Sequence, residues 1–134
     1  MVTFDEMGSM LDEIANEMPP EFYRELNGGV QLSAEEKIHP ESVSPQALYI
    51  LGEYYNDRKG YGGLGRYIVI YYGSFLRLYP YYDGESIKNE LRRVVRHEFT
   101  HHIESLAGER GLEIKDAAAM EKYKYRRLMV YKKP

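Results

Sequence analysis

The residues with the clearest chemistry are His97, Glu98 and His101, which form an H-E-x-x-H pattern. Side chains four positions apart project from the same face of an α-helix, so the two imidazoles can bind one metal ion. Glu98 directly follows the first imidazole and can take a proton from an activated water molecule. The spacing therefore predicts a zinc-dependent hydrolase with about one zinc ion per chain.

A catalytic zinc ion needs a third protein ligand, and the carboxylates after His101 are the candidates. Glu109 follows Gly108, which can end the helix and turn the chain back over the site. Glu104 lies on the same helix face as His97, but about 10.5 Å further along the axis at the standard rise. It can lean back to the ion, or hydrogen-bond to a ligand histidine. More distant alternatives are Glu113 and Asp116.

His102 directly follows the pair, but its side chain points elsewhere. At the helical repeat it lies about 140° from His97 around the helix axis, on the apolar side. The two side chains cannot share one ion, so we expect His102 to be packed or hydrogen-bonded in the interior.

A long helix must carry these residues, and the sequence predicts one from about Gly84 to Ala107 with Asp83 as its N-cap. Apolar side chains recur along one side of this helix and arginines along the other. The histidine pair lies at one edge of the apolar side, and Glu98 lies within it. This placement predicts that the helix forms one wall of a cleft.

The rest of the chain predicts shorter elements around this helix. A capping box at residues 3–6 begins an N-terminal helix that ends at paired prolines, and a short second helix follows through Leu26. Ser74 is expected to cap another short helix through Tyr79. Strands are expected at 30–32, 48–55 and 66–72, with a loop at 34–45 and a hairpin connection at 56–65. Together these elements predict an α+β fold with a small twisted sheet packed against the active-site helix.

The predicted strand at 66–72 is the candidate edge for substrate binding. An extended peptide can add to the exposed edge of a sheet through main-chain hydrogen bonds. At the end of this strand, Tyr71 and Tyr72 can offer a hydroxyl to the reacting carbonyl. We therefore expect the substrate to lie along this strand, above the metal.

Composition limits the other classes of function. The chain has 134 residues, 43% of them hydrophobic, which suits a single domain over 1–134 with one core. It contains no cysteine, which excludes disulfides, a thiol nucleophile and a thiolate zinc site. A net charge of −3 and the lack of a long apolar run predict no membrane partner and a cytoplasmic location. Oligomeric state is left open.

The C-terminal part predicts a helix at 115–128 and a basic tail from about residue 122. Its bases and tyrosines are interleaved, as in surfaces that bind a phosphate backbone. Basic residues near the end of a helix more commonly form a solvated face that complements the helix dipole. We therefore expect no nucleic-acid partner.

Three features of the chain occur together in one known family. They are an acidic N-terminal helix ending in paired prolines, a strand at 66–72 running into GSFLRL, and ELRRVVR leading into HEFTHH. This layout, over most of 4–112, resembles the small bacterial zincin-like metallopeptidases. The resemblance implies a zincin fold, with His97 and His101 as zinc ligands and Glu98 as general base. Members typically carry H-E-x-x-H-x-x-G-x-x-D, whereas Glu104 and Ala107 stand at the Gly and Asp positions here.

Two functions are compatible with these observations. The first is a zinc metallopeptidase that acts on peptides or unfolded protein segments, as the H-E-x-x-H pattern predicts. The second is a catalytically inactive zincin-like module that binds metal or another protein. The second hypothesis is motivated by the third ligand, which does not carry over from the family pattern by position.

Overall fold

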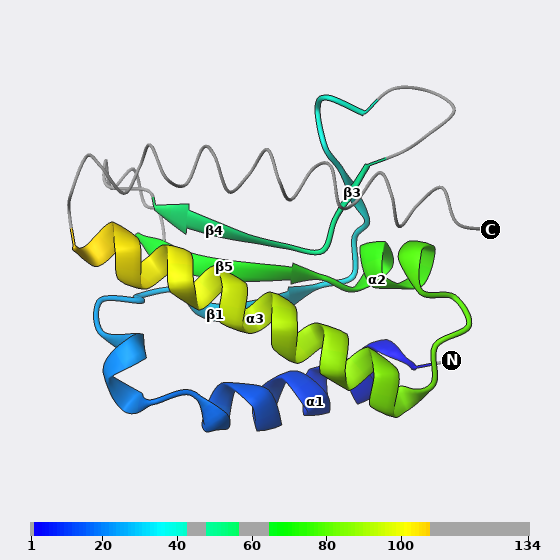
Figure 1. The fold of residues 1–134 in the computed structure, drawn as a ribbon, viewed down its shortest axis with the longest axis horizontal. Coiled ribbons are helices and arrows are strands. Elements are labelled where there is room, and N and C mark those ends of the chain that lie inside the picture. The colour runs from blue at the N-terminus through cyan, green and yellow to red at the C-terminus, as the bar shows by residue number, and fades with distance from the viewer. Residues whose placement is uncertain (1, 43–47, 57–64, 108–134) are drawn as a thin grey trace.

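The computed structural model describes residues 2–42, 48–56 and 65–107. Regular structure begins with helix α1 and a short 3₁₀ helix η1, continues through five strands, and ends with two helices (Figure 1). The bounds are α1 Phe4–Glu17, η1 Pro20–Tyr23, β1 Gly29–Ser33, β2 Lys37–Ile38, β3 Tyr49–Ile50, β4 Gly52–Asn56, β5 Arg66–Tyr71, α2 Tyr72–Leu78 and α3 Gly84–Leu106. The predicted α+β class is confirmed.

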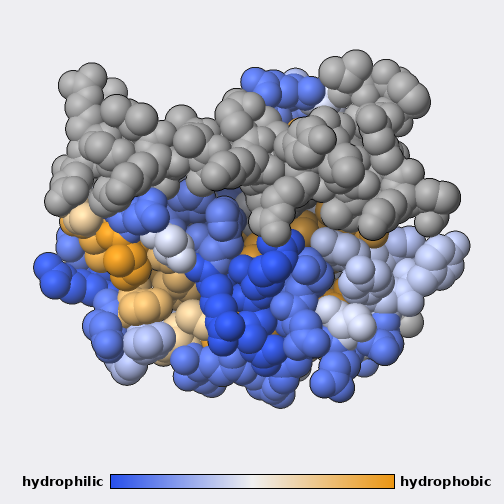
Figure 2. Space-filling model, viewed as in Figure 1, coloured by the Kyte–Doolittle hydropathy of each residue, from blue (hydrophilic) through white to orange (hydrophobic). Residues whose placement is uncertain are grey.

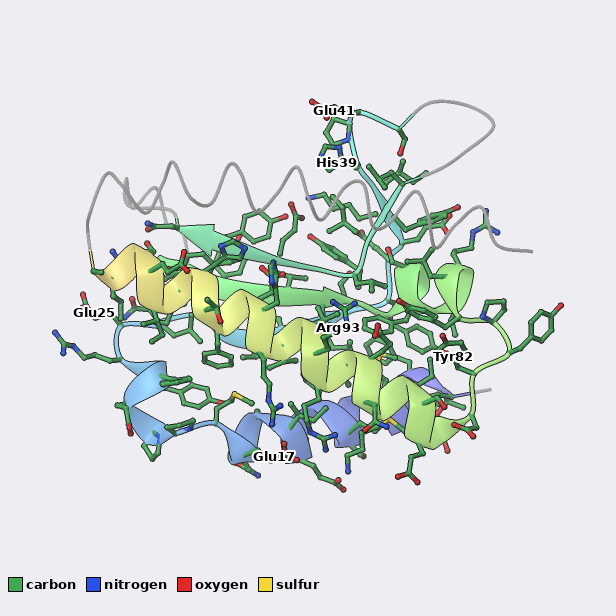
Figure 3. All side chains as sticks on the ribbon, in the orientation of Figure 1. Glu17, Glu25, His39, Glu41, Tyr82 and Arg93 are labelled. Atoms are coloured by element: carbon green, nitrogen blue, oxygen red, sulfur yellow. The ribbon has the colours of Figure 1, made fainter. Side chains whose placement is uncertain are left out.

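The main sheet has three strands in the order β1-β5-β4. β5 pairs in parallel with β1 and antiparallel with β4, so β5 is the central strand. β2 and β3 form a separate two-stranded ribbon. Figure 3 places His39 and Glu41 at the far end of this ribbon, beyond the β4 side of the main sheet.

Helix α3 packs across β4 and β5, and α1 packs against α3 and β1 (Figure 1). Side chains alternate along a strand, so Ile68 and Ile70 of β5 point to the same side, and both are fully buried. Helix and sheet approach closely at Gly52, where a Cβ atom would lie 2.8 Å from Cγ1 of Val94 and 3.0 Å from Cδ1 of Ile70. Only glycine permits this separation between α3 and the edge strand β4.

Both long helices begin where the sequence predicts. At α1, the Thr3 side chain accepts from the amide of Glu6, and the Glu6 carboxylate accepts from the amide of Thr3. At α3, the Asp83 carboxylate accepts from the amide of Ser86 at 2.7 Å. These contacts satisfy amides that have no partner within the helix.

Several shorter predictions were wrong in their bounds. The predicted strand 48–55 is divided into β3 and β4, and the predicted loop 34–45 contains β2, because these pairings depend on partners distant in sequence. The second helix ends at Tyr23. Ser74 does not cap α2; it lies inside that helix, and its hydroxyl accepts from the amide of Lys37 at 2.9 Å. The predicted helix 115–128 and the basic tail lie outside the described residues.

None of the helices in the described part of the chain combines the length and the apolar content needed to span a bilayer. Hydrophilic residues cover the middle of the face shown in Figure 2, where the outward side of α3 lies. Two arginines on that side are in ion pairs, Arg92 with Glu17 and Arg93 with Glu90. The outward side of α3 is therefore a solvated, charge-paired surface.

Candidate metal centre

The imidazoles of His97 and His101 lie close together on the second half of α3. Their Nε2 atoms are 3.0 Å apart, and the two ring planes are nearly perpendicular at 88°. Two nitrogens bound to one tetrahedral zinc ion at about 2.0–2.1 Å lie about 3.3 Å apart. Slight rotation of the two rings would bring both lone pairs onto one ion, so the pair fits zinc.

Glu98 lies between the two histidines in sequence but is more deeply placed. Its exposure is 5%, whereas both histidines are only partly buried. The prediction that Glu98 lies on the apolar side of α3 is confirmed. A carboxylate is seldom buried unless it has polar partners or a chemical role, so Glu98 is not an ordinary solvated helix residue.

No third donor lies beside the pair in the described part of the chain. Within 2–42, 48–56 and 65–107, no three His, Asp or Glu side chains are close enough together to hold a metal ion. Glu104 of α3 does not form such a group with the two histidines, as the helical rise over seven residues explains. Glu109, Glu113 and Asp116 lie outside the described residues.

His102 is fully buried and makes two hydrogen bonds, as the sequence predicts. Its Nε2 atom is 2.8 Å from the carbonyl oxygen of Arg24, and its Nδ1 atom is 2.8 Å from the hydroxyl of Tyr54. Burial lowers the pKa of the His102 imidazole. The ring is therefore engaged in the interior and is not part of the candidate metal centre.

The strand expected to receive the substrate differs from the prediction. We expected residues 66–72 to form the exposed edge, but β5 has a strand on each side. β1 and β4 are the edges of the described sheet, and β4 is the edge that packs against α3. The amide of Tyr71 donates to the carbonyl of Leu51 at 2.9 Å. Since antiparallel pairs alternate, Gly52, Tyr54 and Asn56 direct their backbone groups away from β5.

The two predicted tyrosines are not beside the histidines. The hydroxyl of Tyr71 donates to Glu53 at 2.9 Å on the side of the sheet opposite α3, and that of Tyr72 donates to the carbonyl of Val2 at 2.7 Å. Both hydroxyls are thus committed to structural hydrogen bonds. Their expected role at the reacting carbonyl was wrong, because both hydroxyls are hydrogen-bonded to other groups.

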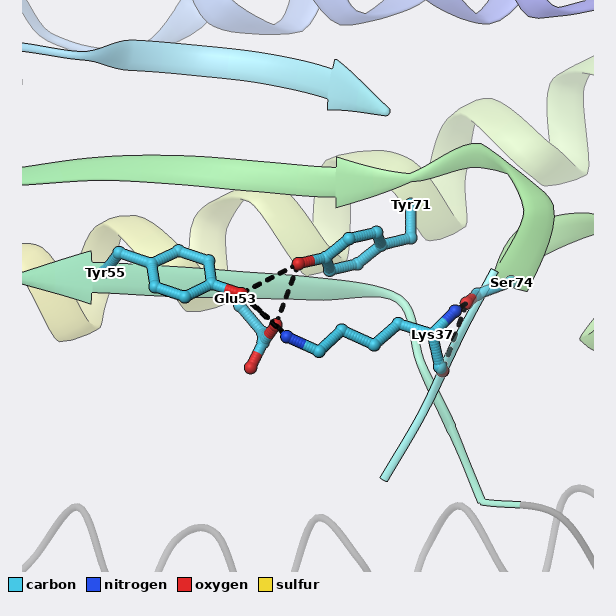
Figure 4. A network of polar contacts seen from close by, with 5 residues as sticks. All are labelled: Lys37, Glu53, Tyr55, Tyr71 and Ser74. Carbon is cyan, nitrogen blue, oxygen red and sulfur yellow. Dashed lines mark hydrogen bonds and ion pairs between the residues drawn. The ribbon is translucent and has the colours of Figure 1, made fainter. Parts of the chain in front are cut away.

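A second polar cluster lies on that opposite side of the sheet (Figure 4). The Glu53 carboxylate accepts from the Lys37 ammonium at 2.5 Å and from the hydroxyls of Tyr55 at 2.6 Å and Tyr71 at 2.9 Å. Burial alone would raise the pKa of Glu53, but these donors outweigh it and hold the pKa below its usual value. Sequence reasoning missed this cluster, although alternate polar residues at 53 and 55 of a strand were a usable signal.

The fold and the site together define a class of protein. It is an α+β domain that carries two paired histidines and a buried glutamate on one long helix. A solved structure described as a conserved hypothetical protein from Thermus thermophilus is similar, with 33% sequence identity and a TM-score of 0.64. The match covers 79% of this chain and 98% of that chain, and the chain belongs to the same family as that protein. No protein-family model and no curated protein matches the chain.

Proposed function

We propose that this protein is a zincin-like, zinc-dependent metallopeptidase that hydrolyses peptide bonds in peptides or unfolded protein segments. The observation that carries the proposal is the convergence of the His97 and His101 Nε2 atoms, 3.0 Å apart, beside the buried Glu98. Two donors and a base on one helix form the larger part of a catalytic zinc site. Glu109 is the first candidate for the remaining ligand.

Each residue of the site has a definite task in this reaction. His97 and His101 would hold the ion through their Nε2 lone pairs, which requires neutral rings protonated at Nδ1. When bound, zinc supplies Lewis-acid activation of a water molecule and of the scissile carbonyl. The carboxylate of Glu98 takes the proton of the attacking water and delivers it to the leaving amine. The apolar surroundings of Glu98 limit competing solvent.

The substrate would bind along β4 as an added strand. β4 is one of the two edge strands of the described sheet and packs under α3, which carries the histidines. Main-chain hydrogen bonds to such an edge hold a peptide in extended form with little dependence on its sequence. This mode suits unfolded segments, which expose extended backbone.

The decisive experiment combines metal content with peptide hydrolysis. Purified wild-type protein should hold about one zinc ion per chain by elemental analysis and cleave a mixed peptide library. Glu98→Gln should retain the metal and lose about 10²- to 10⁴-fold in rate, because it removes only the base. Glu85→Gln, the same change at an exposed site in the first turn of α3, should behave as wild type.

Two outcomes would contradict the proposal in different ways. Protein that binds no zinc, with every measurable activity unchanged by His97→Ala, would remove the metal site altogether. Protein that binds zinc but cleaves no peptide would favour the inactive metal-binding or interaction module. Comparison of zinc affinity in Glu109→Gln and Glu104→Gln would identify the third ligand, since loss of a ligand weakens binding strongly.

A further inference from the structure

The hydrogen bonds of His102 determine which of its nitrogens carries the proton. A backbone carbonyl only accepts, so the Nε2 atom, 2.8 Å from the carbonyl oxygen of Arg24, must carry a hydrogen. The other ring nitrogen, Nδ1, lies 2.8 Å from the hydroxyl of Tyr54. The ring therefore connects the Arg24 carbonyl to the Tyr54 hydroxyl through both of its nitrogens.

This one ring connects three elements of the fold. His102 directly follows the candidate ligand His101 on α3, Tyr54 lies in the middle of β4, and Arg24 follows η1. The next residue, Glu25, has a φ of 61°, a conformation that residues other than glycine seldom adopt. The turn after η1 thus contains a strained residue, Glu25, directly after the Arg24 carbonyl that lies against His102.

Other contacts between α3 and β4 restrain their relative position less. Gly52 and Val94 meet through apolar packing, which is non-directional. The side-chain amide of Asn56 donates to the hydroxyl of Ser105 at 2.9 Å, but this bond is exposed to water. The bond between Tyr54 and His102 is directional and is partly shielded from water, so it restrains both the distance and the rotation of α3 relative to β4.

We propose that Tyr54 and His102 are positioning residues that hold the histidine pair of α3 at the correct distance from a peptide bound along β4. This inference rests on the proposed function. The metal is held by groups of α3 and the peptide by groups of β4, so hydrolysis requires the two elements in one relative placement. A misplacement of about 1 Å costs on the order of 10²-fold in rate.

The test separates metal binding from catalysis. Tyr54→Phe removes one hydroxyl and keeps the ring, so zinc affinity should stay within about twofold, because both ligand histidines are unaffected. The kcat for peptide hydrolysis should fall about 10- to 100-fold with a smaller change in KM. Tyr71→Phe is the matched control: it removes a tyrosine hydroxyl on the other side of the sheet and should leave kcat within about twofold.

Conservative replacement of the imidazole gives a second comparison. His102→Gln keeps an N–H group that can donate to the carbonyl of Arg24, whereas His102→Leu keeps no polar atom. The glutamine variant should therefore retain more of the wild-type kcat than the leucine variant when both are folded and zinc-loaded. Equal kcat values for the two would contradict the positioning role.

A measurement on metal-free protein tests the contact without any activity. Nitrogen-15 NMR of the His102 ring should show a proton on Nε2, which donates to the carbonyl of Arg24, and Tyr54→Phe should shift the Nδ1 resonance. An Nδ1 resonance that is unchanged in Tyr54→Phe would overturn the proposal. So would a zinc-loaded Tyr54→Phe variant that cleaves peptides as wild type does. Wild type that binds zinc and cleaves no peptide would instead contradict the proposed function, and the catalytic role of this pair with it.

Discussion

The two faces of strand β4 are held by different kinds of contact. On the α3 side, Tyr54 bonds to the neutral, fully buried His102. On the other side, the carboxylate of Glu53 pairs with the ammonium of Lys37, and their side chains are 29% and 38% exposed. The ion pair of this strand lies where water still reaches it, because complete burial of an ion pair costs more than it returns.

The two faces of β4 therefore respond differently to the surrounding solution. The contact toward α3 joins a hydroxyl to an imidazole without an ion pair, so its geometry depends little on salt. The contact on the other side is ionic, and Lys37 also lies over the rings of Tyr55 at 5.4 Å and Tyr71 at 5.5 Å. It anchors the ribbon of β2 and β3 to the main sheet. The position of α3 on β4 thus depends on the side without an ion pair, and attachment of the ribbon depends on the charged side.

The largest effect is expected from His102→Leu. The change leaves the carbonyl of Arg24 and the hydroxyl of Tyr54 buried without their partner, at about 1–3 kcal/mol each. Urea unfolding at pH 7 should show a loss of about 3 kcal/mol in the free energy of unfolding. His39→Leu, at the partly exposed end of the ribbon, should cost less than about 1 kcal/mol. Similar losses in both variants would show that His102 has no special role.

A smaller effect is expected from Glu53→Gln on the charged side. Since the Lys37 side chain is 38% exposed, solvent screening limits the loss at pH 7 to about 1 kcal/mol. The folded-state pKa of Glu53 lies below the unfolded value, so its contribution is complete above about pH 4.5 and is lost as the pH falls further. Wild type should therefore lose more stability than Glu53→Gln below that pH. Parallel acid titrations of the two proteins would contradict this account.

Removal of the Lys37 ammonium should lower the free energy of unfolding less than Glu53→Gln does. Lys37→Met keeps most of the aliphatic stem, so the free energy of unfolding should fall by about 0.5 kcal/mol in low salt. The difference from wild type should shrink as sodium chloride is added, because salt screens the ion pair that only wild type contains. A difference that stays constant up to high salt would mean that packing of the stem, not charge, fixes the ribbon.

The smallest effect concerns the coupling between the two faces. Tyr54→Phe and Tyr71→Phe remove hydroxyls that share no partner and point to opposite sides of the sheet. Their effects on the free energy of unfolding should add to within about 0.5 kcal/mol in a double-mutant cycle. A coupling energy above about 1 kcal/mol would show that the two faces act as one unit.

Features with local signals could be predicted from the sequence. The capping box of α1 and the Asp83 cap of α3 follow from the residues at the helix starts. The convergence of His97 and His101 and the burial of Glu98 follow from helical spacing. The central place of β5 could not be predicted, because it depends on parallel pairing with β1, far away in the chain. The cluster around Glu53 could not be predicted for the same reason. Lys37 belongs to a strand of two residues, which is too short to show an alternating sequence pattern.

The pairing of β5 also bears on the order in which the protein folds. β4 and β5 are neighbours in sequence, with Asn56 opposite Arg66, whereas the parallel pair joins Gly29 to Tyr67. A short loop closes at lower entropic cost than a long one, so the β4–β5 hairpin is expected to form before β1 adds to it. The edge strand β4, along which we propose that a substrate binds, is then among the first parts of the sheet to form. Until α3 covers its apolar face, this early hairpin is the segment most exposed to aggregation.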